Sequence, residues 1–519
     1  MVLLMENYKK FIGPVIIGLI TSLVLSITSS FPIKNLFWGS WIFTSIGFFS
    51  INFLLNKFSC NKFTILIVVF SLLLRLGLGF ITTYNLLDWG YEDEPYTSGY
   101  LFKDAYTRDN QAWDLATSDK PIWAAFSNDF FSDQYGGLLA LSSFVYRIFT
   151  PNAHAQFNII FLVSIINAIG IIFLAKGLLG YKGEETYSVT SKFILLIFSF
   201  YPDAILFSSS QMREPLLFGL SAILFWIVHE PKLKIISRIV MFLITSIVIL
   251  FVSLKIGLFI IFSFFIWLLF KPYVLEYKFL KPKYLFPLII LFVIVSFYFS
   301  YNWIIEAAKW DALLLERNSG FVQYVVSIIG TRYRLAFASL YGLLQPVLPA
   351  TLIEPSKLFW RIINSLRALG WYLLMPGLIY GLVYLFREKD KNRKVQFGVF
   401  WLISIFWIIL SSVRAGGDMW DNPRYRISFL VFISYIVAQA FLYGWKSKDH
   451  WLTRIILAEV IFILFFLQWY IARYLGIFDN LPFMQMVGIL SIIFIVIFVS
   501  GLVHEFGRKN KAKTNVTLS

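Results

Sequence analysis

The chain is built mainly of long apolar segments, separated by short basic connections and by two long polar segments. A stretch of about 20 predominantly apolar residues is long enough to cross the hydrocarbon core of a bilayer as an α-helix. The bilayer core holds no water to satisfy backbone groups, so a crossing segment must satisfy them internally, as a helix does. The sequence therefore predicts an all-α polytopic integral membrane protein.

The composition agrees with this fold class. Of the 519 residues, 59% are hydrophobic and only 14% are charged, whereas soluble domains carry about 25% charged residues. This excludes a soluble enzyme or a secreted domain. The net charge of +16 would indicate a nucleic-acid partner in a soluble protein, but here basic cytoplasmic loops explain it, so no nucleic acid is expected. The single cysteine, Cys60, excludes an internal disulfide, and no Cys/His cluster offers a zinc site.

About fourteen transmembrane helices are predicted, several of them short. Placing the N-terminus in the cytoplasm makes every cytoplasmic connection basic, as the positive-inside rule requires. The densest run of cations, residues 387–394, then lies inside, and both termini are cytoplasmic. The predicted spans are 11–30, 36–56, 64–84, 157–178, 192–209, 214–229, 239–253, 255–270, 284–302, 369–386, 397–412, 426–445, 455–473 and 485–504.

Two long segments are predicted to lie outside, so that the whole chain, residues 1–519, forms one transmembrane domain with an external layer. The first, residues 85–156, is acidic near its start, and the second, residues 303–367, is amphipathic and basic. Residues 136–150 are apolar enough to suggest a further span. A crossing there would invert every later loop, so they are expected to form a juxtamembrane or re-entrant helix.

Several arginines are predicted on the outer side, where the positive-inside rule disfavours cations. Their presence there calls for a physical explanation. Arginine binds oxyanions through two parallel hydrogen bonds from its planar fork. Several arginines at one face would suit a lipid phosphate or pyrophosphate, and the alternative is snorkelling toward lipid headgroups. The candidates are Arg213 at a tight turn, Arg332 and Arg334 in Thr-Arg-Tyr-Arg, and Arg424 and Arg426 in Pro-Arg-Tyr-Arg.

The first external segment supplies a candidate catalytic acid. Residues 103–116 are expected to be helical, and Asp104 follows closely after the predicted span 64–84. A carboxylate at this position can take a proton from an attacking hydroxyl. With Asp109 as a second carboxylate it can also hold a divalent cation. No other cofactor is expected, because the sequence has no Walker loop and no Gly-rich dinucleotide turn.

The order of these motifs resembles the GT-C class of membrane glycosyltransferases, which includes glycosyltransferase family 39, the protein O-mannosyltransferases and the aminoarabinose transferases. The stretch from Asp104 to Ala116 is similar to the first external loop of that class, where an acidic residue is the catalytic base. The stretch from Tyr135 to Thr150 lies where the class has a juxtamembrane helix, although its Pro-Pro pair is absent. The turn containing Arg213 and Glu214 resembles the polar turn that follows.

The resemblance implies a helical bundle with external juxtamembrane helices and an inverting sugar transfer. The donor would be a polyprenyl-phosphate sugar, membrane lipids would be further partners, and the acceptor would be a lipid, glycan or protein. Asp104 would be the base, Asp109 a possible second acidic or metal residue, and Glu214 and Tyr135 further site residues. The phosphate would be held by Arg213, Arg332, Arg334, Arg424 and Arg426.

Other functions fit the same pattern. A polysaccharide polymerase or ligase also binds lipid pyrophosphate with external arginines, and depends less on an aspartate in the first loop. A lipid-linked oligosaccharide flippase can also have fourteen spans, but such transporters are built of internal repeats, and none is visible here. A non-catalytic scaffold is a third alternative. The expected location is the cytoplasmic membrane of a bacterium, with the site facing outward.

Overall fold

The computed structural model describes residues 2–29, 31–130, 136–182, 187–270, 282–318, 320–477, 479 and 481–517. Within these residues every regular element is a helix. Their contacts divide the chain into two compact units. Unit 1 consists of residues 1–292 and 424–434, and unit 2 of residues 293–423 and 435–519.

The helices are those of a polytopic membrane protein. Of the described residues, eight helices are long and apolar enough to cross a membrane, or up to ten if each of two bent helix pairs is one span. The same described residues also contain four shorter apolar helices of 10–17 residues, among them Gly136–Phe149 and Glu214–His229. The all-α membrane fold is thus confirmed, whereas the number fourteen is not.

Two spans that the sequence predicts as single helices are bent pairs. The predicted span 192–209 is broken into α7 (Val189–Phe200) and α8 (Pro202–Ser208), which are inclined by 44°. Pro202 cannot donate a backbone hydrogen bond, so it ends the first helix and begins the second. The buried Arg75 donates from Nη1 to the Ser199 carbonyl at this break, at 3.0 Å. The predicted span 426–445 is likewise α19 and α20, inclined by 78°.

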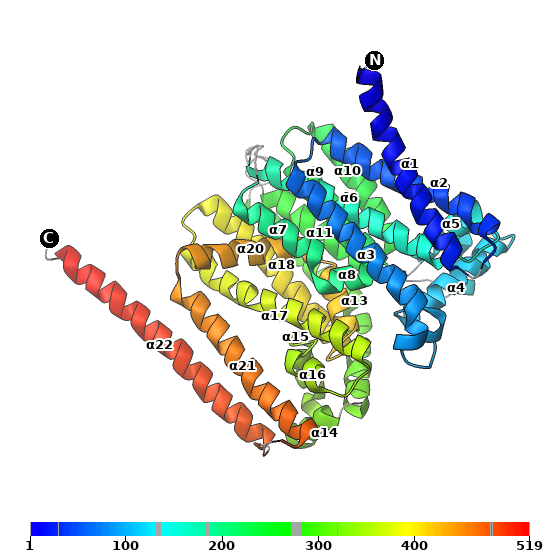
Figure 1. The fold of residues 1–519 in the computed structure, drawn as a ribbon. Helices are drawn as coiled ribbons and strands as arrows, with labels where there is room; N and C mark the ends of the chain where they lie inside the picture. Colours follow the sequence, from blue (N-terminus) through cyan, green and yellow to red (C-terminus); the bar gives the residue numbers. More distant parts are fainter. Residues whose placement is uncertain are drawn as a thin grey trace. The chain divides into compact units, whose positions relative to one another are not determined.

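Unit 1 begins with two antiparallel neighbours, α1 and α2, and contains the predicted first external segment (Figure 1). That segment forms α4, as the sequence predicts, and α5, the expected short helix. The elements are α1 (Val2–Thr28), α2 (Ile33–Lys57), α3 (Lys62–Trp89), η1 (Tyr96–Ser98), α4 (Lys103–Thr117), η2 (Ile122–Phe126), η3 (Asn128–Phe130), α5 (Gly136–Phe149), α6 (Gln156–Lys182), α7, α8, α9 (Glu214–His229), α10 (Ile235–Val252) and α11 (Leu254–Phe270).

The helices α6 and α9 form the centre of unit 1, and almost all of α9 is buried. A Cβ atom added to Gly170 on α6 would lie 2.8 Å from the Gly219 carbonyl oxygen on α9. Only a residue without a side chain fits there. Small residues let helix backbones approach closely in a membrane, where apolar burial alone does not drive association. The glycine pair therefore fixes how closely α6 and α9 pack, and with it the position of the first residue of α9.

The remaining helices belong mainly to unit 2, and the boundaries between the units fall within α13, α19 and α20, because residues 424–434 belong to unit 1. The helix α13 runs well past the end of the predicted span 284–302, and α17 begins before its predicted start at 369. The elements are α13 (Pro282–Asn318), α14 (Gly320–Ile329), η4 (Thr331–Tyr333), α15 (Arg334–Leu343), α16 (Leu348–Ile353), α17 (Leu358–Arg387), α18 (Lys391–Ala415), α19 (Asp421–Ile427), α20 (Leu430–Lys446), α21 (His450–Leu475) and α22 (Phe483–Thr517).

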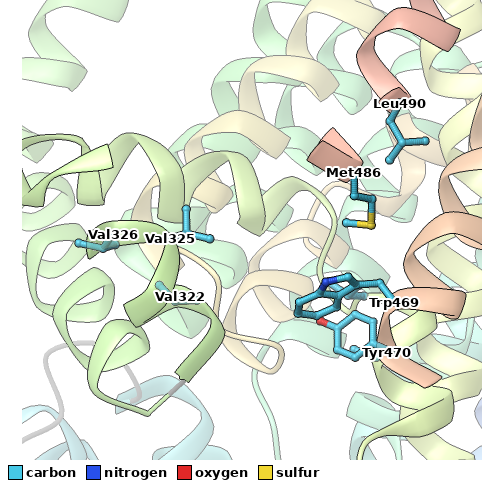
Figure 2. Close-up of a cluster of buried hydrophobic side chains, with 9 residues drawn as sticks. Val322, Val325, Val326, Trp469, Tyr470, Met486 and Leu490 are labelled. Carbon is cyan, nitrogen blue, oxygen red and sulfur yellow. The ribbon is translucent and has the colours of Figure 1, made fainter. Parts of the chain in front are cut away.

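A buried apolar cluster in unit 2 holds its short helices against the hairpin of α21 and α22. Figure 2 shows the valines of α14 together with Trp469 and Tyr470 of α21 and Met486 and Leu490 of α22. Val347 and Ala350, beside and within α16, complete the cluster. The predicted external segment 303–367 is therefore anchored by apolar packing near the ends of two long helices.

We expect a Met486→Ala protein to lose about 2–3 kcal/mol of stability, because Met486 is fully buried in this cluster and its truncation leaves a cavity. Met484 lies two residues earlier on the same helix and is 51% exposed, so Met484→Ala is a matched control. The measurement is unfolding by titration with sodium dodecyl sulfate in mixed micelles. Equal midpoints for the two variants would contradict the packing.

Candidate functional site

Four charged side chains of unit 1 form a continuous chain of contacts. Arg424 donates from Nη1 to Oδ2 of Asp104 at 2.8 Å and from Nε to Oε1 of Glu214 at 2.9 Å. Arg213 donates from Nε to the same Glu214 oxygen at 3.1 Å. Asp104 and Arg424 are 320 residues apart in the sequence. The fold thus brings together the predicted base, two of the predicted phosphate-binding arginines and Glu214.

Helix ends position both carboxylates. Asp104 lies in the first turn of α4, and Glu214 is the first residue of α9. The N-terminal end of a helix carries a partial positive charge, which stabilises an acidic side chain there. Pro215 follows Glu214 at the start of α9, a position where its missing N–H leaves no bond unmade. Arg424 comes from the short helix α19.

Burial decreases along this chain of charges. The side chains of Glu214, Arg213 and Arg424 are 0%, 2% and 6% exposed, whereas that of Asp104 is 47% exposed. Buried charges are tolerated only where opposite charges and hydrogen bonds compensate them. Glu214 supplies this compensation for both arginines. Asp104 is then the member of the cluster that a molecule from outside can reach.

The other predicted site residues are not part of the chain of contacts described above. Arg426 is buried in α19, two residues after Arg424. Arg332 and Arg334 belong to unit 2, where Arg332 is exposed and Arg334 forms an ion pair with Glu316. Tyr135 lies outside the described residues.

Asp109 forms a second, separate network on the opposite side of α4. Its carboxylate is buried and accepts from the Tyr100 and Tyr146 hydroxyls, each at 2.7 Å. His154 Nε2 lies 3.0 Å from Oδ2 of the same carboxylate, and Trp113 stacks on the imidazole ring. Burial, and then the charge of Asp109, raise the pKa of both tyrosines above the usual range, so that they remain hydrogen-bond donors.

The two aspartates of α4 do not meet at one site. Five residues of an α-helix turn through about 500°, so Asp104 and Asp109 point about 140° apart. The donors around Asp109 already use both of its oxygens. The geometry therefore does not support the sequence hypothesis of a cation shared by this pair. Among the described residues, no group of three or more His, Cys, Asp or Glu side chains is placed to hold a metal ion.

Sequence reasoning missed the residues that orient α4. Arg147 of α5 donates to the carbonyls of Leu115, Ala116, Ser118 and Lys120 at the end of α4. Cations near the C-terminal end of a helix stabilise it. The sequence shows only that Arg147 and His154 lie in or beside an apolar external stretch. Nothing in their spacing relates them to α4.

Comparisons of the chain with models of protein families, with curated proteins and with solved structures find no match.

Proposed function

We propose that this protein is a membrane glycosyltransferase that transfers a sugar from a polyprenyl-phosphate donor to a hydroxyl acceptor at the outer face of the cytoplasmic membrane. The observation that supports this best is the contact between Asp104, a half-exposed carboxylate, and Arg424, an almost completely buried arginine. A proton acceptor beside a fixed cation is what such a transfer requires, because a proton leaves the acceptor while negative charge develops on the departing phosphate.

Each residue of the cluster has a distinct role in this proposal. Asp104 takes the proton of the acceptor hydroxyl, whose oxygen attacks the anomeric carbon. The bond from that carbon to the phosphate oxygen breaks, and the phosphate leaves with the electron pair. Arg424, with Arg213 and Arg426, stabilises the leaving phosphate, and Glu214 holds Arg424 and Arg213 in place.

The location follows from the charges. Both termini are proposed to lie in the cytoplasm, with Asp104 on the outer side, because this orientation keeps the basic connections inside. A donor with a long lipid tail reaches such a site from within the bilayer, which suits a multi-pass chain.

We expect Asp104→Asn to lower transfer by about 10²–10⁴-fold, the usual contribution of a general base. The assay uses purified protein in nanodiscs with a panel of polyprenyl-phosphate monosaccharides and follows the release of polyprenyl phosphate. Asp114→Asn is the matched control, because Asp114 is exposed on the same helix. Both variants should unfold at the same detergent concentration as the unaltered protein.

The same assay separates the proposal from a polysaccharide polymerase or ligase. Full activity of Asp104→Asn, or turnover only of lipid-pyrophosphate oligosaccharides, would contradict a transferase with an aspartate base. Movement of lipid-linked oligosaccharide across a vesicle membrane without any transfer would point to a flippase.

A further inference from the structure

The helix α10 is short for a helix that crosses a membrane. Among the helices of the described residues that are long and apolar enough to do so, it is the shortest, with 18 residues. This length corresponds to about 27 Å, whereas the hydrocarbon core of a bilayer is about 30 Å thick. The next helix, α11, begins after the single residue Ser253, so α10 cannot itself fill the difference. A second apolar surface at this end would complete the thickness.

One face of α10 is apolar and exposed along its whole length. Ile236, Leu243 and Ile247 are exposed on it, and so is Phe251 in the last turn. These residues recur at the spacing of a single helix face. In a helix that crosses a membrane, such an exposed stripe faces the acyl chains of the lipids.

The short helix η2 continues this stripe beyond the end of α10. Phe126 of η2 contacts Phe251, with the two ring centroids 5.1 Å apart, and is 50% exposed. Trp123 lies three residues earlier in η2 and is 75% exposed. Side chains three residues apart in a 3₁₀-helix lie above one another. Trp123 and Phe126 therefore form one exposed aromatic face, next to the lipid-facing stripe of α10.

Close packing holds η2 at this level of unit 1. A Cβ atom added to Gly137 would overlap the carbonyl oxygen of Phe251, so α5 starts directly against the last turn of α10. Ala125 of η2 is completely buried. Arg147 of α5 donates from Nη2 to the carbonyl of Lys120, directly before η2, at 2.9 Å. The aromatic face is thus presented by a fixed element.

The residues that flank η2 are charged. Lys120 and Asp129 form an exposed ion pair, with 2.6 Å between Nζ and Oδ2. An exposed aromatic face beside charged groups suits the boundary between membrane and water. Tryptophan is enriched at this boundary, because its ring system is apolar while its N–H needs a polar partner.

We propose that Trp123 and Phe126 form an aromatic anchor that inserts into the head-group region of the bilayer at the outer end of α10. The partner is membrane lipid, whose first acyl carbons contact the two rings while a head-group oxygen accepts from the Trp123 N–H. This inference rests on the membrane-spanning helices and does not depend on the proposed transfer reaction. Arg147 also binds the carbonyls at the end of α4, so the aromatic anchor holds α4 at a fixed depth.

The test measures the depth of position 123 by electron paramagnetic resonance of a nitroxide label. Cys60, the only cysteine of the chain, is replaced by serine. Trp123→Cys is then labelled in protein reconstituted into vesicles of phosphatidylcholine and phosphatidylglycerol. Phe126 and the packing of η2 remain in this variant, so the label reports the depth of the element itself.

The label's collisions are measured with oxygen, which concentrates in the bilayer, and with nickel ethylenediaminediacetate, which stays in water. Two further labelled positions calibrate the ratio of the two collision rates. Asp114→Cys, at an exposed position of α4, marks water, and Ile247→Cys, on the stripe of α10, marks the hydrocarbon core. We expect the oxygen-to-nickel ratio at position 123 to be severalfold higher than at position 114 and lower than at position 247. All three variants should unfold at the same concentration of sodium dodecyl sulfate as the unaltered protein.

Two results would overturn the proposal. A ratio at position 123 equal to that at position 114 would show that the aromatic face lies in water and serves a soluble ligand, such as a glycan. A ratio equal to that at position 247 would place η2 within the hydrocarbon core, where no head-group oxygen reaches the Trp123 N–H.

Discussion

An Arg424→Ala protein is expected to lose about 3 kcal/mol of stability and essentially all transfer activity. Removing one member of a buried ion pair costs about 3–5 kcal/mol, because the other charge stays buried without compensation. The lower end applies here because Arg213 still contacts Glu214. The half-exposed Asp104 adds little, since water solvates it once Arg424 is gone. Loss of one transition-state donor lowers transfer by a further factor of about 10²–10³.

Stability is measured by titration with sodium dodecyl sulfate in mixed micelles, and activity by the release of polyprenyl phosphate. Arg361→Ala is the control, because Arg361 is an exposed arginine of α17. A second variant separates folding from chemistry. Arg424→Met combined with Glu214→Leu and Arg213→Met removes all three buried charges and should regain much of the lost stability, while transfer stays absent. A stable, fully active Arg424→Ala protein would refute the role given to the cluster.

The sequence predicts the helices better than it predicts their contacts. Apolar length and basic connections are local properties, so α2, α3, α6, α21 and α22 could be located from them. Charge in the first external segment likewise identified α4 and its acidic first turn. The bends at Tyr201 and before Leu430 were missed, because hydropathy averages over a window and does not register a break of one or two residues.

The candidate site could be predicted in part, because charged side chains are unexpected beside predominantly apolar segments. Charged residues such as Arg424 and Glu214 stand out in an apolar chain, and in the structure Arg424 donates to the carboxylates of both Glu214 and Asp104. The partners of Asp109 could not be predicted. Tyr100 and Tyr146 have no unusual neighbours in the sequence. The packing of α5 against α4 brings the Tyr146 hydroxyl to the carboxylate, and the segment between η1 and α4 brings that of Tyr100.

An Asp109→Ala protein is expected to lose about 4 kcal/mol of stability, which makes it the most destabilising single substitution in unit 1 that we predict. The carboxylate accepts from two buried phenols and contacts His154, and hydrogen bonds to a charged group contribute about 1.5–3 kcal/mol each. The three contacts act on one residue, so their contributions do not simply add. The larger part of the cost comes from the two hydroxyls, which the truncation leaves buried without an acceptor.

The consequence for the site is indirect. Asp109 anchors α4 five residues beyond Asp104, so its loss should free the helix start and lower transfer without removing the base. Asp109→Asn, which keeps an acceptor, should lose about half as much stability, and Asp114→Ala on the exposed face of α4 less than about 0.5 kcal/mol.

The dependence on pH provides an independent check of the Asp109 network. The pKa of Tyr100 and of Tyr146 is raised in the folded protein, so each phenol contributes stability below its ordinary pKa of about 10 and loses it only as the pH rises through the raised value. The difference between the unaltered protein and Asp109→Ala should therefore stay constant from neutral pH to about pH 9. Unfolding titrations at several pH values measure it, and a difference that vanishes within this range would show that the tyrosines are not the donors that hold α4.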